Sequence, residues 1–279
     1  MKNPNTGVGM AQTSDMKKED LFSRLLAYDS LPSTNEHCKK DEVRHGNVVL
    51  ALKQSAGHGR MGRSFSSPEG GVYVSFCYEP HISPEELLPL TGMCAVAVRE
   101  AIEQVCGVSP SIKWTNDIVL SGKKICGILA ETLLDGGMVK KLIIGIGINL
   151  NQRAEDFDAE LLKIASSVSM LTSESYDKMS LLLALAKEID GVYEALLKGR
   201  EAIVPYVYEY RKYCETLRRD VRVLKSAISG GKDPREVFAE TPDAFPQAFA
   251  EDIDDSFALI VRYQSGEKET LFSGEVSIR

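Results

Sequence analysis

A stretch rich in glycine and arginine in the first quarter of the chain has the composition of an anion-binding loop. Gln54–Arg63 reads QSAGHGRMGR, so three glycines alternate with His58, Arg60 and Arg63. Glycine lets the backbone adopt positive φ and approach a ligand, and successive N–H groups can then form a concave anion site. Arginine adds a fixed charge suited to carboxylate or phosphate. The alternative interpretation is a mobile, solvated surface loop.

Two common nucleotide motifs do not describe this loop. It lacks the G-x-x-x-x-G-K-[ST] pattern of a Walker A element. Gly57, Gly59 and Gly62 satisfy G-x-G-x-x-G, but Ser64–Pro68 is a poor helix start and Gly70–Gly71 extends the loop. We therefore do not expect a dinucleotide site.

A second polar motif follows in the middle of the chain. Lys113–Asp117 reads KWTND and predicts a turn between two strands, and Lys123 and Lys124 then lead into an apolar run. A lysine at the start of an apolar strand can hold its ammonium at the mouth of a cavity, where it would meet an anion. The alternative is that the two lysines only form a charged hairpin turn.

The elements that must position these motifs follow from the hydrophobic pattern. Ser33 with Glu36 three residues later indicates a helix N-terminus with a capping box. Apolar residues at helical spacing predict one long helix from Ser83 to about Cys106. Short apolar runs near the N-terminus predict strands at Arg24–Leu31, Asn47–Gln54 and Val72–Tyr78.

The middle of the chain predicts an antiparallel meander between Ser111 and Asn151, because strand-like runs alternate with turn signals. The expected strands are residues 112–114, 118–120, 124–134 and 140–150. The helices expected after them are Ala154–Ala165, Tyr176–Lys198 and Arg200–Leu217.

The C-terminal quarter predicts a small β-barrel as a second domain. Its strand-like segments are residues 221–225, 237–240, 257–263 and 269–272. An insert rich in proline and acidic residues, Gly230–Asp255, is expected to be a solvated loop, with contact to the carrier or to ATP as the alternative. The expected division is a disordered polar tail at 1–23, a catalytic domain at 24–217 and the small domain at 218–279.

The composition restricts the class of protein. Of 279 residues, 43% are hydrophobic and 26% charged, as in ordinary globular proteins, and no apolar run approaches the roughly 20 residues of a membrane span. The polar N-terminus lacks a signal core, so we expect a cytoplasmic protein. A net charge of −7 argues against nucleic-acid binding. Six cysteines without C-x-x-C predict buried thiols, and four scattered histidines argue against a metal site.

Taken together, six motifs in one order resemble the biotin protein ligases, which biotinylate the carrier domain of biotin-dependent carboxylases. The resemblance runs from about Arg24 to the C-terminus. The DNA-binding domain of the family's repressor members is not expected here, because 23 residues before Arg24 are too few to form it. It implies an α+β fold: a mixed, largely antiparallel sheet flanked by helices, like class II synthetases, with an SH3-like C-terminal barrel. The motifs are Ser33–Asn35, Gln54–Arg63, Lys113–Asp117, Lys124–Glu131, Gly145–Leu150 and Gly274–Arg279.

The implied reaction has two steps. The biotin carboxylate attacks the α-phosphate of ATP to give biotinyl-5′-AMP and pyrophosphate, and a carrier lysine then attacks the anhydride and releases AMP. By resemblance, Lys124, Arg60 and Asp117 are the expected catalytic residues. Lys124 would bridge the carboxylate and the α-phosphate, and Asp117 would orient the incoming amine. Mg²⁺ would enter with ATP rather than through protein ligands.

The resemblance also implies two binding sets. The neutral ureido ring of biotin requires neutral hydrogen-bonding partners in an otherwise apolar cavity. The expected biotin residues are Ser33, Thr34, Asn35, Gln54, His58, Gly59, Arg60 and Lys124. The expected ATP and adenylate residues are Arg60, Arg63, Asn116, Lys124 and Asn149.

His58 departs from the family, whose members often have arginine there. Because imidazole is only partly charged near neutrality, we expect retention of the adenylate to fall between about pH 6 and 8. A flat intermediate off-rate, equal to that of His58→Arg, would contradict this hypothesis. The alternative is that His58 contacts ligands only through its backbone.

Two rival functions differ in motif or charge. A lipoate ligase or octanoyltransferase has a related fold, but its Arg-Arg-x-Ser-Gly-Gly-Gly core is not found here. A non-catalytic biotin sensor or transcriptional regulator is disfavoured by the acidic charge and by the expected lack of a DNA-binding domain. Edge strands of the meander could pair two subunits as a homodimer, or pair with the carrier domain.

Overall fold

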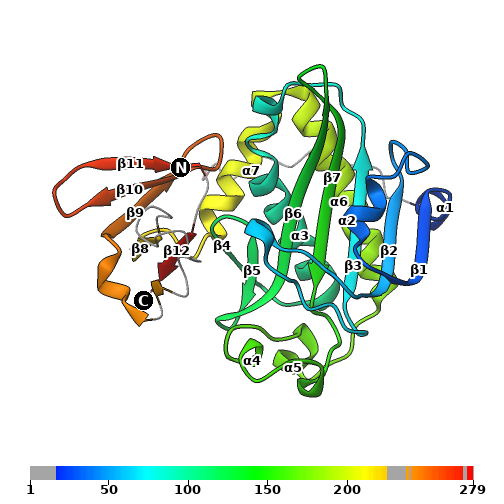
Figure 1. Ribbon diagram of the computed structural model, residues 1–279, viewed down its shortest axis with the longest axis horizontal. Coiled ribbons are helices and arrows are strands. Elements are labelled where there is room, and N and C mark those ends of the chain that lie inside the picture. Colours follow the sequence, from blue (N-terminus) through cyan, green and yellow to red (C-terminus); the bar gives the residue numbers. More distant parts are fainter. Residues whose placement is uncertain (1–16, 225–236, 239, 273–274, 279) are drawn as a thin grey trace, which may run out of the picture.

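The larger part of the molecule is a seven-stranded mixed sheet. The computed structural model describes residues 17–224, 237–238, 240–272 and 275–278 (Figure 1). The strand order is β1-β2-β3-β7-β6-β5-β4; β1 and β2 are parallel, and all other neighbours are antiparallel. The strands are β1 (Leu25–Leu31), β2 (Val48–Gln54), β3 (Val72–Tyr78), β4 (Ser111–Lys113), β5 (Asp117–Leu120), β6 (Lys123–Asp135) and β7 (Met138–Ile148).

Helices cover one face of this sheet and leave the other open to ligands. The covering layer is formed by α3 (Leu90–Cys106), α6 (Lys178–Lys198) and α7 (Arg200–Tyr213), which lie behind the sheet in Figure 1. All seven residues of β3 are buried, which explains its apolar sequence. Among the described segments, the short helix α2 (Thr34–Cys38) and the loop after β2 lie on the opposite face. The fold therefore leaves room for a cavity on that face.

A second, antiparallel sheet follows α7. Its order is β11-β10-β9-β8-β12, and it is joined to the larger part by a packed interface. Trp114 Nε1 donates to the carbonyl of Phe257 at 2.9 Å, and the Phe257 ring fills the space beside Gly92 on α3. The strands are β8 (Asp220–Leu224), β9 (Gln247–Ile253), β10 (Leu259–Tyr263), β11 (Lys268–Leu271) and β12 (Glu275–Ile278).

The predicted strands of the larger sheet, including the meander, are confirmed, but two predicted helices are interrupted. Ser83–Cys106 divides into a short 3-10 helix, Pro84–Leu87, and α3, because Pro89 has no N–H to continue the hydrogen-bond ladder. Ala154–Ala165 divides into the 3-10 turn Ala154–Asp156 and α4 (Leu161–Ile164). Ala165 leaves the helix because it pairs with the backbone of Lys124.

The ends of other predicted segments also differ from the structure. An unpredicted helix, α5 (Val168–Thr172), is capped by Ser167, whose side chain accepts from Met170 N. α7 ends at Tyr213 rather than Leu217, because Glu215 N donates to the carbonyl of Ile112 on β4. The disordered tail predicted through residue 23 is wrong over α1 (Lys18–Phe22), where Leu21 is fully buried.

The predicted insert contains a strand that the sequence pattern concealed. Gln247–Ile253 forms β9, near the middle of the second sheet, and is not a solvated loop. Its inward residues include two alanines, which give a weak hydrophobic signal. Val237, Phe238 and Glu240 are helical rather than part of a strand, and residues 225–236 lie outside the described part.

The thiols agree with expectation. All six cysteines are free and buried, as predicted. No helix in the described ranges is long and apolar enough to span a membrane.

Candidate functional site

A cavity of about 770 Å³ opens on the uncovered face of the larger sheet. It lies against α2, the glycine loop, β6 and β7, and part of the second sheet reaches its rim. All twelve residues predicted for catalysis or binding line it: Ser33, Thr34, Asn35, Gln54, His58, Gly59, Arg60, Arg63, Asn116, Asp117, Lys124 and Asn149. The structure therefore brings together every predicted site residue, although they come from five segments of the chain.

One part of the cavity, which we call the neutral side, is formed by Ser33, Thr34, Asn35, Gln54 and Gly145. Ser33 caps α2 by accepting from Glu36 N, as its sequence position predicts. Thr34 N and Oγ1 both donate to Gln54 Oε1, at 2.8 and 3.1 Å. Gln54 Nε2 in turn donates to Ser67 Oγ at 2.9 Å. These bonds fix the side chain of Gln54 against the start of α2.

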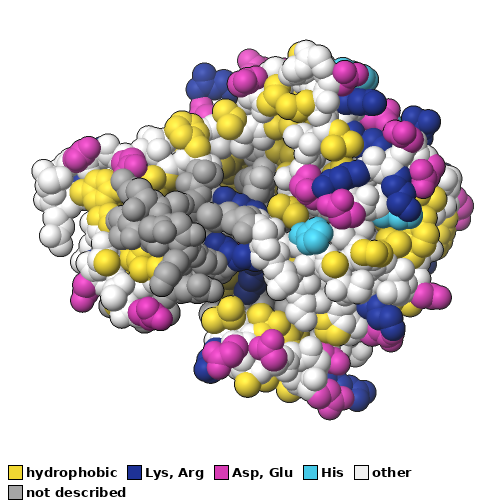
Figure 2. Space-filling view, in the orientation of Figure 1, with side chains coloured by type: hydrophobic (Ala, Val, Ile, Leu, Met, Phe, Trp, Pro, Cys, Tyr) yellow, Lys and Arg dark blue, Asp and Glu magenta, His cyan; other side chains and the backbone are white. Residues whose placement is uncertain are grey.

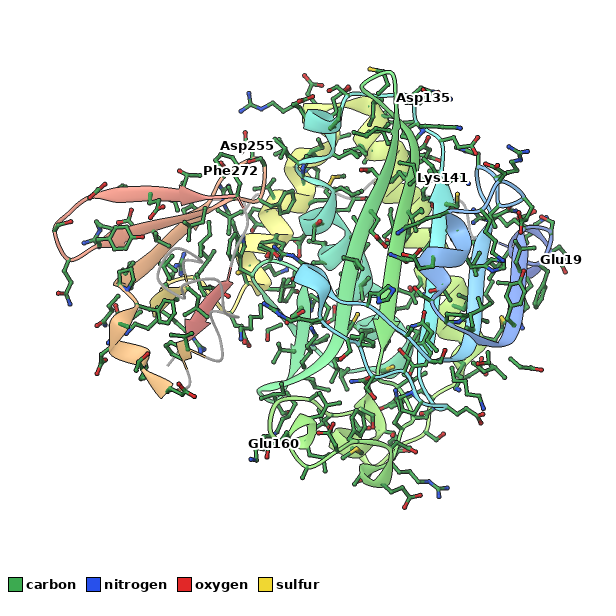
Figure 3. All side chains as sticks on the ribbon, viewed as in Figure 1. Glu19, Asp135, Lys141, Glu160, Asp255 and Phe272 are labelled. Carbon is green, nitrogen blue, oxygen red and sulfur yellow. The ribbon has the colours of Figure 1, made fainter. Side chains whose placement is uncertain are left out.

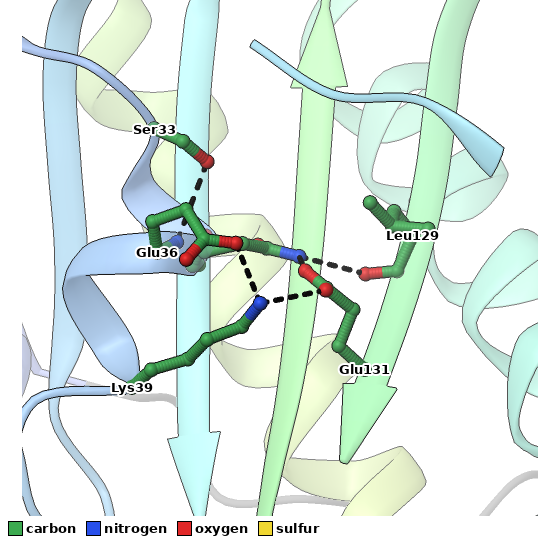
Figure 4. Close-up of polar contacts among 7 residues, drawn as sticks. Ser33, Glu36, Lys39, Leu129 and Glu131 are labelled. Carbon is green, nitrogen blue, oxygen red and sulfur yellow. Dashed lines mark hydrogen bonds and ion pairs between the residues drawn. The ribbon is translucent and has the colours of Figure 1, made fainter. Parts of the chain in front are cut away.

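Asn35 is held by partners that the sequence did not reveal. Its Nδ2 donates to Glu131 Oε2 at 2.8 Å, and its Oδ1 accepts from Ser75 Oγ at 2.6 Å. Lys39 pairs with the same Glu131 carboxylate at 2.9 Å (Figure 4). Burial would raise the pKa of Glu131, but the bonds from Asn35 and Lys39 outweigh it, so the pKa lies below its usual value. Glu131 is therefore an ionised acceptor that orients Asn35.

Three glycines of β6 and β7 make space for these side chains. A β-carbon at position 145 would lie 2.1 Å from Asn35 Oδ1, and one at position 147 would lie 2.6 Å from the Phe65 ring. A β-carbon at Gly127 would lie 3.2 Å from Phe65 and 3.3 Å from Lys124 Nζ. The Gly145–Leu150 motif thus serves close approach. Phe65 and Ser75 were missed, although Ser75 is a lone hydroxyl in an apolar strand.

The opposite part of the cavity, which we call the charged side, is formed by Arg60, Asn116, Asp117 and Lys124. Lys124 Nζ lies 2.6 Å from Asp117 Oδ1, and the lysine side chain is 33% exposed. Its ammonium is 6.0 Å from the centre of the Phe65 ring. Lys124 is thus half-buried, paired with one carboxylate and still reachable from the cavity.

The two adjacent lysines have different surroundings. Lys123 Nζ donates to the carbonyls of Leu162 and Lys163 at 3.0 and 2.7 Å, and so binds the end of α4. Lys124 instead enters the cavity beside Asp117. The alternative, that the two lysines only form a charged hairpin turn, is therefore wrong.

The glycine loop is folded back on itself. Gly59 N donates to the carbonyl of Arg63 at 2.6 Å, and Phe65 N donates to that of Gly57 at 2.8 Å. Gly62, with φ of +73°, allows the turn between them. Arg60 leaves this loop and donates to Thr115 Oγ1 and to Asn116 Oδ1, the latter at 3.0 Å. Arginine thereby links the loop to the second polar motif.

Asn149 and His58 lie at different depths. Asn149 is 4% exposed, and its Oδ1 accepts from Gln152 Nε2 at 3.2 Å. Gln152 Nε2 also donates to Tyr73 OH, so the amide that holds Asn149 is itself held in place. His58 is exposed at the rim, where its backbone bridges to Ser64.

Positive charge is concentrated in the cavity although the whole chain carries a net charge of −7. Figure 2 shows Lys and Arg side chains in the hollow between the two parts of the molecule. The lining includes six basic residues and two carboxylates: Arg60, Arg63, Lys113, Lys124, Lys163 and Arg219, with Asp117 and Glu215. Cationic side chains in a partly enclosed site attract anions more strongly than they would in open water.

The second sheet and the segment leading to it contribute wall residues that were not predicted. They are Glu215, Arg219, Leu224, Phe238 and Val276. Within the described residues, no three His, Cys, Asp or Glu side chains are arranged to hold a metal ion.

Comparison with known proteins gives consistent relatives. Residues 27–149 match the model of the Biotin/lipoate A/B protein ligase family. The chain is 33% identical over 269 residues to the bifunctional ligase/repressor BirA of Bacillus spizizenii, covering 94% of this chain and 76% of that protein. It is 29% identical to the biotin–[acetyl-CoA-carboxylase] ligase of Paracoccus denitrificans, covering 81% and 90% of the two chains.

Two further similarities differ in extent. The BirA protein of Bacillus subtilis is 40% identical over 171 residues, which span 53% of its length. The structure of the biotin protein ligase from Aquifex aeolicus in complex with biotin and ATP has a TM-score of 0.73 at 27% identity. This match covers 92% of this chain and 99% of that one.

Proposed function

The chain belongs to the biotin protein ligases, and we propose that its cavity joins biotin to ATP and then transfers biotin to a carrier lysine. The observation that carries the proposal is the adjacency of two unlike surfaces in one cavity. A neutral side whose polar groups are already oriented adjoins a charged side centred on Lys124 and Arg60. Biotin has a neutral ring system at one end and a carboxylate at the other, and it matches both.

The neutral side would bind the ureido ring. Ser33, Thr34 and Gln54 offer a hydroxyl, a hydroxyl and an amide, and two of them are fixed to each other by hydrogen bonds. Neutral donors and acceptors suit an uncharged ligand, because a buried unpaired charge would be costly. Asn35, held by Glu131 and Ser75, completes this side.

The charged side would bring the two anionic reactants together. The carboxylate of biotin and the triphosphate of ATP repel each other, so cationic groups placed between them lower the barrier to attack on the α-phosphate. Lys124 would contact both reacting groups, and Arg60 and Arg63 would hold phosphate oxygens. Asn116 and Asn149 would bind the nucleotide. Mg²⁺ would be carried by the triphosphate oxygens and would shield the departing pyrophosphate.

Asp117 has a role in the second step. Its carboxylate lies 2.6 Å from Lys124 Nζ, next to the position where the anhydride would form. A carboxylate there can accept a hydrogen bond from the incoming carrier amine and orient it toward the carbonyl. The transfer forms an amide and releases AMP. The partner is then a biotin carboxyl carrier domain, which presents its lysine at the cavity mouth.

A substrate comparison tests the proposal. The purified full chain, given ATP and Mg²⁺, should exchange labelled pyrophosphate into ATP with biotin and should biotinylate a carrier domain. Biotin methyl ester is the matched control, because it keeps the ring and lacks the reacting carboxylate. Use of lipoate in place of biotin would contradict the proposal, and the biotin ligase relatives disfavour that alternative.

A further inference from the structure

We propose that Lys141 is a positioning residue for biotin, because its ammonium fixes the far end of the helix that carries the neutral side. Lys141 lies in β7, is 5% exposed, and donates to three backbone carbonyls. The acceptors are Cys38 O at 3.1 Å, Lys40 O at 2.9 Å and Val43 O at 2.8 Å. This inference rests on the proposed function of α2 in biotin binding.

The surroundings of this ammonium explain its dependence on α2. Lys141, labelled in Figure 3, has no ion pair with a carboxylate in the described part of the chain. The three carbonyls therefore supply its hydrogen bonds. Beside it is a small apolar cluster of Cys38, Val43, Val49, Cys77 and Ile143. A buried ammonium requires hydrogen-bond acceptors such as these three carbonyls. The carbonyls would in turn be left unpaired without the ammonium.

The geometry of β7 links this anchor to the cavity. Side chains at alternate positions of a strand point to the same face, so Lys141, Ile143 and Gly145 form one row. The row faces α2 along its length. Lys141 holds the end of the helix, Ile143 packs in the cluster beneath it, and Gly145 leaves space for Asn35 at its start.

α2 is too short to keep its own position. It has five residues, and isolated helices of that length are not stable in water. Its first turn presents Thr34 and Asn35 to the cavity, and its last turn is bound by Lys141. Loss of the anchor would let the first turn shift relative to Gln54 and the floor of the cavity. A displacement of about 1 Å is enough to weaken a well-fitted contact strongly.

The inference predicts a selective loss of biotin affinity. Lys141→Met keeps an unbranched apolar stem as far as the ε-carbon and removes the ammonium with its three donors. We expect the Kd for biotin, measured by calorimetry on the full chain, to rise at least about tenfold, and the Kd for ATP to change less than about twofold. Lys140→Met is the matched control, since Lys140 is the exposed neighbour on the other face. Lys141→Arg should restore most of the affinity.

The outcomes separate this inference from the proposed function. Equal losses for biotin and ATP, or a lowered melting temperature with unchanged biotin affinity, would show a merely structural lysine and overturn the inference. If the methionine variant does not fold, Lys141→Gln, which keeps two N–H donors on a shorter stem, carries the same comparison of the two Kd values. Failure of the unmodified chain to activate biotin would instead overturn the proposed function.

Discussion

The neutral and charged sides of the cavity differ in how firmly their side chains are held. On the neutral side, Thr34, Asn35 and Gln54 are each hydrogen-bonded to neighbouring side chains of the protein. On the charged side, Lys124 is one-third exposed and paired with Asp117, so an incoming anion must share or replace that carboxylate. The first surface is prepared before binding, whereas the second exchanges partners during the reaction. Recognition and catalysis are thus expected to fail separately when either side is altered.

The largest expected effect comes from the charged side. Lys124→Ala should lower the single-turnover rate of biotinyl-AMP formation by about 10²- to 10³-fold, because it removes the charge nearest the developing transition state. The Kd for biotin should change far less, since the neutral side is left intact. The matched control is Lys123→Ala, because the ammonium of Lys123 binds carbonyls of α4 and not the cavity. Undiminished carrier biotinylation by Lys124→Ala would refute the mechanism.

A smaller effect, on biotin affinity rather than on rate, is expected on the neutral side. In Gly145→Ala, the new methyl group would lie 2.1 Å from Asn35 Oδ1 and would force that side chain from its hydrogen bonds. We expect the Kd for biotin to rise roughly tenfold, with ATP affinity nearly unchanged. Isothermal titration with each ligand measures both values. An unaltered biotin affinity would mean that Asn35 is not part of the recognition surface.

A third prediction concerns a carboxyl group that lies outside both sides of the cavity. Burial raises the pKa of Glu100, on α3, to about 7, and the carboxylates of Glu188 and Glu209 act in the same direction. The folded protein therefore holds this proton more tightly than the unfolded chain does. Its contribution to stability is present below about pH 4.5 and is lost as the pH rises to about 7.

Replacing that carboxyl group should therefore stabilise the protein only at higher pH. Glu100→Gln should raise the free energy of unfolding at pH 8 by about 1 kcal/mol, or a few degrees in melting temperature, and have little effect at pH 4.5. Melting curves at the two pH values measure this difference. Biotin and ATP affinities should stay unchanged. An equal shift at both pH values would show that packing, rather than ionisation, is responsible.

Chain pattern alone predicts much of this architecture, because its strongest signals are local. The apolar runs of β2, β3 and the meander predict strands, and the Ser33 cap predicts the start of α2. Two of the predictions that are wrong involve long-range contacts. Ala165 leaves its expected helix to pair with Lys124, and β9 is concealed by the small side chains that its sheet buries.

The site shows the same division between local and long-range information. The six motifs, through their resemblance to the biotin protein ligases, were sufficient to select twelve residues that line the cavity. The partners of those residues could not be selected in this way. Ser75 and Glu131 read as ordinary members of their strands, and Lys141 as one of two adjacent lysines in a hairpin.

By itself, the sequence determined the strands of the larger sheet and the motifs whose polar and charged side chains line the cavity. The tertiary structure alone decided that Lys123 binds α4, away from the cavity, and that Lys141 rather than Lys140 is buried under α2. The physical reason is alternation along a strand. Neighbouring residues of one type point to opposite faces, and only the packing of distant segments determines which face becomes the site.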